Sequence, residues 1–334
     1  MGIKGLLPFL KDRGCIQDFV SWPDNSKIAI DVPIFAHKFI YAERSYEALV
    51  KKFIAFGHEL RLKKSEPIFV FDGEKLAAKA KERQKRSVLR EKQLDRNAIK
   101  QSKIIEELFA SGIEIISPDG APPEFKGLMI PTRKEYDDLK IELSSAGFDV
   151  QTAQYEAEAL CAHLVTNNLA WASLTEDTDS VAFGSPRTIF RFFGAPIIVE
   201  LDSVLSKLEL TRDQFIELCC LFGNDFCEHI YKIGPETSFS LMKKHKSWAT
   251  IYEKERFGWF ARTRESGEIF QDSIEDAKEV FATCAFEQSN KKAKTDFEFD
   301  AKPESADSAP EASEAEKSAR PNSADGISLA ALRQ

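Results

Sequence analysis

Seven carboxylates stand at the ends of short apolar runs or in tight acidic pairs of this 334-residue sequence. Any one of them alone is better explained by a local role, such as a turn or the start of a helix. Carboxylates that share one crevice, however, repel one another and need cations. Two Mg²⁺ ions about 4 Å apart, each held by a few carboxylates, can grip the attacking and leaving oxygens of a phosphodiester. The set therefore predicts metal-assisted phosphodiester hydrolysis by Asp31, Asp72, Glu156, Glu158, Asp177, Asp179 and Asp225.

Other catalytic signals and membrane signals are lacking in the sequence. No His/Cys grouping has the spacing of a zinc site, and no GxxxxGK[ST] phosphate loop occurs. The six cysteines form no CxxC pair, which favours a reducing compartment. No apolar run approaches the roughly 18 residues that span a bilayer. We therefore expect a soluble protein with no membrane partner.

Three apolar runs predict the elements that position the acids. Residues 27–31, 67–72 and 170–174 are typical of buried parallel strands, and each run ends in an acid or is followed by acids. Helical apolar spacing at 46–58 and 156–165 completes an alternating α/β pattern. In such folds ligands bind beyond the carboxyl ends of the strands. A mainly parallel sheet flanked by helices would thus bring the acids to one crevice.

Positive charge is concentrated in one segment of an otherwise acidic chain. The formal net charge is −8, yet Lys75 to Lys103 holds eleven Lys or Arg and only three acids. The range 76–108 predicts a long helix with little apolar face, which would project into solvent. After a Gly/Pro-rich loop, 131–145 predicts a returning helix. We expect these helices to form a basic arch, 75–145, inserted between the second and third predicted strands.

A helical hairpin and a tail complete the predicted organisation. Thr211 and Gln214 predict a capping box that opens one helix, and Pro235 predicts the start of the next, so that 211–245 forms a helix–loop–helix. From Lys291 onward almost no large apolar residue remains to build a core. The predicted regions are 1–74 and 146–290 for the core, 75–145 for the arch and 291–334 for a disordered tail.

Six motifs in order resemble the flap endonuclease and exonuclease-1 superfamily of structure-specific 5′-nucleases, to which the XPG proteins belong. They are Met-Gly-Ile-Lys-Gly-Leu at the start, Ile-Ala-Ile-Asp31, Val-Phe-Asp72-Gly, Tyr-Glu156-Ala-Glu158-Ala, Thr-Glu-Asp177-Thr-Asp179-Ser and Gly-Asn-Asp225-Phe-Cys. The resemblance runs to about residue 250. It implies a PIN-like α/β nuclease core with a helical arch and a helix–two-turn–helix that binds DNA.

The resemblance also implies roles for individual residues. Two Mg²⁺ ions, for which Mn²⁺ can substitute, would be held by all seven acids, the first four chiefly serving one ion and the last three the other. Lys79 and Arg86 match the family's catalytic pair and share one helix face, where they would stabilise charge in the transition state. Gly2, His37 and Arg44 would contact the branched DNA.

The hairpin departs from the family at a K⁺ site. The family's Gly-Ile-Gly is Lys232-Ile-Gly234 here, and Glu236 replaces a usual basic residue. Losing the first glycine restricts the backbone, so survival of the K⁺ site stays open. We expect Lys232 and Gly234 to contact the duplex, with activity that depends little on K⁺.

The predicted activity is cleavage at the base of 5′ DNA flaps, in replication and repair. One alternative is a 5′ to 3′ double-strand exonuclease of the exonuclease-1 type, because His37 and Lys38 replace a Tyr usual in flap endonucleases, although 210–227 resembles the flap branch. The other alternative is a DNA-binding scaffold with degenerate acids.

The chain is expected to be a monomer whose partner is branched or flapped DNA. Sliding-clamp binding is not expected, since no clamp motif follows Ser289. A cellular enzyme would be nuclear, and a viral origin stays open.

Overall fold

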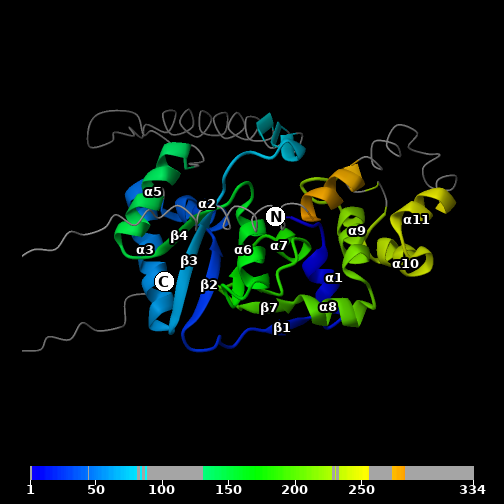
Figure 1. Cartoon of the computed structure of the whole chain (residues 1–334), viewed down its shortest axis with the longest axis horizontal. Coiled ribbons are helices and arrows are strands. Elements are labelled where there is room, and N and C mark those ends of the chain that lie inside the picture. Colours follow the sequence, from blue (N-terminus) through cyan, green and yellow to red (C-terminus); the bar gives the residue numbers. More distant parts are fainter. Residues whose placement is uncertain are drawn as a thin grey trace, which may run out of the picture. The chain divides into compact units, whose positions relative to one another are not determined.

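A seven-stranded sheet in the order β1-β7-β6-β5-β2-β3-β4 forms the centre of the protein (Figure 1). The computed structural model describes residues 2–43, 45–80, 83–84, 87–88, 131–227, 230, 233–255 and 273–282. All of them belong to one compact unit, Met1–Thr295. The strands are β1 Ile16–Asp18, β2 Ser26–Asp31, β3 Ser65–Phe71, β4 Asp149–Thr152, β5 Ala172–Leu174, β6 Arg187–Phe190 and β7 Ile197–Glu200.

The sheet is mainly parallel, as the sequence predicted. The neighbours β6, β5, β2, β3 and β4 run parallel, whereas β7 is antiparallel to both β6 and β1. The predicted runs 27–31 and 67–72 correspond to β2 and β3, and the run 170–174 forms a shorter strand that begins at Ala172. The predicted fold class is therefore confirmed.

Helices cover both faces of the sheet. The helices of the described residues are α1 Leu6–Asp12, α2 Val32–Glu43, α3 Tyr46–Leu62, α5 Arg133–Ser145, α6 Ala157–Thr166, α7 Asp179–Ala182, α8 Leu201–Leu208, α9 Arg212–Phe222, α10 Pro235–His245 and α11 Trp248–Glu255, of which α10 and α11 pack on other helices rather than on the sheet. Ile28 and Ile30 pack with the face that α2, α3 and α5 cover, while Ala29 packs with α6 on the other. This alternation follows from the two-residue period of a strand. Figure 1 shows α3 and α5 on one side of β2 and β3 and α6 on the other.

Local capping chemistry explains where several helices begin. The Thr211 side chain accepts a hydrogen bond from the Gln214 backbone N–H, and the Gln214 side chain accepts one from the Thr211 backbone N–H. These two bonds form the predicted capping box of α9. Thr132 and Glu135 form a second box at the start of α5. Pro235 is the first residue of α10, as predicted, where its missing N–H costs nothing.

The predicted arch lies largely outside the described residues. A 3₁₀ turn at Ala77–Lys79, the helical residues 80, 83–84 and 87–88, and the returning helix α5 can be compared with the prediction. The insertion falls between β3 and β4, so β4 and α6 separate it from the third predicted strand. The sequence did not reveal β4, because this four-residue edge strand is exposed or half-buried throughout. The tail 291–334 also lies outside the described residues. Among the described helices, none is both long and apolar enough to cross a membrane.

Candidate metal centre

Four of the predicted acids meet at the carboxyl ends of β2, β3 and β4. Asp31 ends β2, Asp72 follows β3, and Glu156 and Glu158 open α6 after β4. One carboxylate oxygen each from Asp72, Glu156 and Glu158 lies within 4.8 Å of the others, a grouping that can hold a metal ion. The Ala157 backbone N–H donates to Asp72 Oδ1 at 2.9 Å, which ties the end of β3 to the start of α6.

The other three acids lie in two segments, one between β5 and the start of α7 and one after α9. Asp177 and Asp179 follow β5, and Asp225 follows α9. Asp179 is fully buried, and neither of its carboxylate oxygens has a hydrogen-bond partner among the described residues. Asp177 Oδ1 accepts the Asp179 backbone N–H at 3.1 Å. A buried carboxylate without a partner is costly, so the bare oxygens of Asp179 fit a bound cation.

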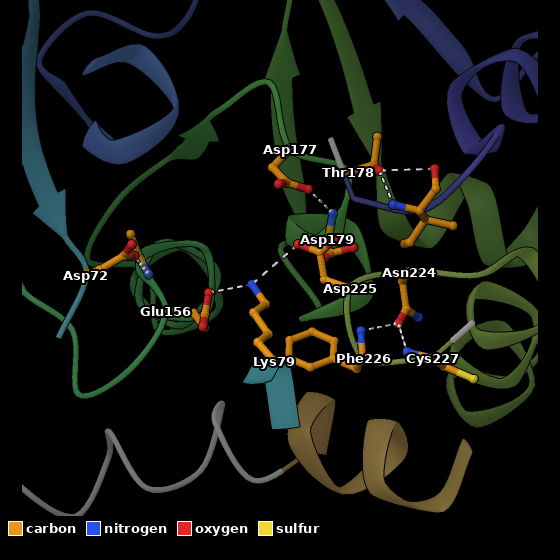
Figure 2. Close-up of polar contacts among 12 residues, drawn as sticks. Asp72, Lys79, Glu156, Asp177, Thr178, Asp179, Asn224, Asp225, Phe226 and Cys227 are labelled. Carbon is orange, nitrogen blue, oxygen red and sulfur yellow. Dashed lines mark hydrogen bonds and ion pairs between the residues drawn. The ribbon is translucent and has the colours of Figure 1, made fainter. Parts of the chain in front are cut away.

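Lys79 places an ammonium group between the two sets of acids (Figure 2). Its Nζ lies 2.5 Å from Glu156 Oε2 and 3.9 Å from Asp225 Oδ2, with side-chain exposures of 12%, 12% and 10%. The same nitrogen sits 4.9 Å from the centre of the Phe226 ring. Burial acts to lower the pKa of Lys79, but the charges of Glu158 and Glu156 outweigh it and raise the pKa. The ammonium group is therefore charged.

The crowding of acids raises their pKa values. Burial, followed by the charges of Asp72 and Asp177, raises the pKa of Asp31 to about 8. Asp72 keeps exposed surface, yet desolvation within the cluster and the charge of Glu156 raise its pKa to about 6. Burial first and neighbouring acids second also raise the pKa values of Glu158 and Asp179 well above their ordinary values. One lysine does not balance this charge, and divalent cations would.

The structure places three of the five residues expected at DNA. Gly2 lies against the acids: a Cβ at this position would stand 2.1 Å from Asp177 Oδ1. His37 is exposed on α2. Gly234 precedes α10, with open space where a Cβ would be. The remaining two, Arg44 and Lys232, lie outside the described residues, as does the predicted catalytic Arg86.

Two threonines that support the acids were missed by the sequence reasoning. Thr175 donates to Asp31 Oδ2 at 2.6 Å and accepts the Asp177 backbone N–H at 2.9 Å. Thr178 accepts the Ile3 backbone N–H at 2.8 Å. Both threonines belong to the Thr-Glu-Asp-Thr-Asp run, so the signal was their position next to acids.

The acid that departs from the family at the start of α10 is paired within the chain. Arg13 donates from Nη1 to Glu236 Oε1 at 2.9 Å and from Nη2 to Oε2 at 2.6 Å. The guanidinium also lies 3.8 Å from the centre of the Phe9 ring. This pairing offsets the negative charge that Glu236 brings to the hairpin.

Known proteins match the segments that carry these acids. The XPG N-terminal domain matches residues 1–93 and the XPG I-region matches residues 147–225. Flap endonuclease 1 of Zea mays is 32% identical over 275 residues, which cover 76% of this chain and 69% of that protein. Flap endonuclease 1 of Cryptosporidium muris is 32% identical over 285 residues, which cover 75% of this chain and 57% of that protein. The chain thus spans 57% and 69% of the lengths of these two relatives.

A solved structure supports the fold. The catalytic core of Rad2 in complex with a DNA substrate superimposes with a TM-score of 0.59 at 18% identity, over 84% of this chain and 86% of that one. The two XPG matches cover the core and the first part of the predicted arch, to residue 93, and leave residues 94–146 unmatched. All seven acids lie within the matched segments. On this evidence the chain belongs to the XPG and flap endonuclease family of metal-dependent nucleases.

Proposed function

We propose that this chain is a Mg²⁺-dependent, structure-specific 5′-nuclease that cuts DNA at the base of 5′ flaps, in replication and repair. The observation that carries the proposal is the gathering of seven acids around Lys79, with the buried oxygens of Asp179 left bare. The names of the flap endonuclease 1 relatives support the substrate class. The chain acts as a monomer.

The acids divide into two ligand sets on either side of Lys79. Asp31, Asp72, Glu156 and Glu158 serve one Mg²⁺, while Asp177, Asp179 and Asp225 serve a second; Mn²⁺ can substitute. When bound, the divalent ions supply Lewis-acid activation of water and neutralise charge on the phosphate. Thr175 fixes the position of Asp31 relative to Asp177, because its hydroxyl donates to the Asp31 carboxylate and accepts the Asp177 backbone N–H.

Lys79 supplies the positive charge that belongs to the protein itself. With its ammonium group at Glu156 and near Asp225, it is placed to contact a phosphate that enters between the ligand sets. There it would stabilise the charge of the transition state together with Arg86. His37 and Arg44 contact the DNA near the branch, and Gly2 contacts it beside the acids.

The helices α9 and α10 form the duplex-binding hairpin. The open start of α10 at Gly234 presents backbone N–H groups, which suit a DNA phosphate. Lys232 adds positive charge there in place of the family's glycine. Equal rates in K⁺ and Na⁺ at matched ionic strength would support this role, and a strong preference for K⁺ would contradict it.

A substrate panel tests the proposed function. End-labelled 5′-flapped, nicked and blunt duplexes are incubated with the protein in Mg²⁺ or in EDTA. We expect the flap to be released as one oligonucleotide, faster than the other ends lose nucleotides, and only with the metal. Binding without cleavage in Mg²⁺ and Mn²⁺ would instead identify a scaffold with degenerate acids.

A double-strand exonuclease is the second candidate, favoured by His37 and Lys38. Blunt or recessed ends would then be digested faster than the flap is released, leaving a mononucleotide ladder. The same panel therefore separates the two activities.

A further inference from the structure

The first residues of the chain join the two loops that carry the second ligand set. The Ile3 N–H donates to Thr178 Oγ1 at 2.8 Å, and Thr178 Oγ1 donates to the Ile3 carbonyl at 3.4 Å. One residue later, the Lys4 N–H donates to the Gly223 carbonyl at 2.9 Å. Thr178 lies between Asp177 and Asp179, and Gly223 lies two residues before Asp225. Figure 2 shows the Thr178 contacts beside these acids.

Close packing at Gly2 holds the same segment against the 175–179 loop. Its φ is +81°, and a Cβ there would stand 2.1 Å from Asp177 Oδ1, 2.7 Å from Thr178 Oγ1 and 2.9 Å from the Asp179 nitrogen. Ile3 and Thr178 are buried, with exposures of 4% and 5%. Water therefore does not compete easily for the hydrogen bonds between them.

The loops need such a tie because their acids repel one another. Asp179 is fully buried, and Figure 2 shows the like-charged Asp177 and Asp225 close to it. The helix that Asp179 opens has four residues, Asp179–Ala182, too few to fix the loop by its own hydrogen bonds. A neutral hydroxyl can hold the loop without adding charge to the site.

We propose that Thr178 is a positioning residue for the second metal. Its hydroxyl fastens the 175–179 loop to Ile3, and the Lys4 to Gly223 hydrogen bond extends the tie to the loop that carries Asp225. The N-terminal segment thereby sets the separation of Asp177 and Asp179 from Asp225. This inference rests on the proposed function, since it concerns the metal site of that reaction.

The test compares Thr178→Val with Thr178→Ser. Valine keeps the shape and loses the hydroxyl, whereas serine keeps the hydroxyl. Each protein is titrated with Mg²⁺ in the absence of DNA while its Tm is followed, and its single-turnover cleavage rate is measured against Mg²⁺. For Thr178→Val the half-saturating Mg²⁺ should rise by roughly 2- to 10-fold, the range that one buried hydrogen bond confers. The rate should recover at saturating Mg²⁺, and Thr178→Ser should behave as the parent protein.

Two controls separate positioning from stability. Thr188→Val removes another buried hydroxyl, which meets Ser180 at 3.5 Å, and should leave the Mg²⁺ midpoint unchanged. Gly2→Ala should raise the midpoint through its clash with Asp177. Gly147→Ala should not, because that glycine has a matching φ of +79° but open space around it.

An unchanged Mg²⁺ midpoint in Thr178→Val would overturn the inference, even if its Tm in EDTA falls. If the Mg²⁺ midpoint of Thr178→Val is raised but the parent protein fails to cut flaps, the proposed function is rejected and the positioning role is kept. A parent protein that cuts flaps while Thr178→Val shows no shift would reject the positioning role alone.

Discussion

Replacing Lys79 by alanine should remove the internal counter-ion of the metal centre. The ion pair with Glu156 is 2.5 Å long and both side chains are 12% exposed. Breaking a buried pair by removing one partner costs roughly 3–5 kcal/mol, because the other charge is left uncompensated. For a domain of this class, each kcal/mol lowers Tm by about 2–4 °C. In EDTA, Lys79→Ala should therefore lower Tm by roughly 6–20 °C.

Lys64→Ala is the matched control for this substitution. Lys64 pairs with Asp24 at 2.6 Å, nearly the same distance, but the side chains are 67% and 63% exposed. Exposed pairs of this kind contribute little to stability, because water already solvates both charges. The Tm of Lys64→Ala should stay close to that of the parent protein. The comparison therefore separates the effect of burial from that of the distance between the paired charges.

Mg²⁺ should reduce the difference in Tm between Lys79→Ala and the parent protein, because divalent cations replace the lost positive charge. Cleavage should nevertheless stay slow. Losing one preorganised charge at a transition state costs about 10²–10³-fold in rate. Single-turnover rates at saturating enzyme measure this loss apart from DNA affinity. If Tm in EDTA falls by the same amount in Lys79→Ala and in Lys64→Ala, Lys79 is not the counter-ion of the acids. A normal rate with weaker binding would reduce it to a phosphate contact.

Four further outcomes are expected. Asp179→Asn should cut at less than a tenth of the parent rate, bind DNA at least as tightly and raise the metal-free Tm, because one like charge is removed. The folded state holds protons on its raised carboxyls that the unfolded chain releases, so the contribution of these carboxyls to metal-free stability should be largest below their ordinary pKa of 3.8 and should fall as pH rises to about 8; Mg²⁺ protection, followed by Tm, should grow over the same interval. His37→Ala should slow release of a labelled flap while His37→Tyr largely preserves it, since a ring at the branch can stack on a base; equal rates would remove this role. Deleting 291–334 should leave the cleavage of short oligonucleotides near normal, and a sliding clamp should stimulate cleavage little either before or after the deletion. A large loss of cleavage would show that the tail contributes.

The sequence alone determined the three strands β2, β3 and β5 and the acids that follow them. Ile28 and Ile30 are buried on one face of β2 and Ala29 on the other, so a strand covered on both faces appears as a continuous apolar run. Where that run stops at Asp31, parallel topology sends the side chain to the shared crevice. The capping box of Thr211 and Gln214 was equally readable, because its two hydrogen bonds span only three residues.

Only the tertiary structure decided how the acids are supported and neutralised. Thr178 meets Ile3 across 175 positions of sequence, and Lys79 meets Glu156 across 77. No local pattern encodes such pairs, since they depend on the path of the chain between them. The pKa values of Asp31 and Asp179 likewise follow from burial among like charges, which depends on packing and not on residue type. Sequence therefore identified the acids that gather in the cluster, while their protonation, their counter-ion and the hydrogen bonds that position them emerged from contacts between distant segments.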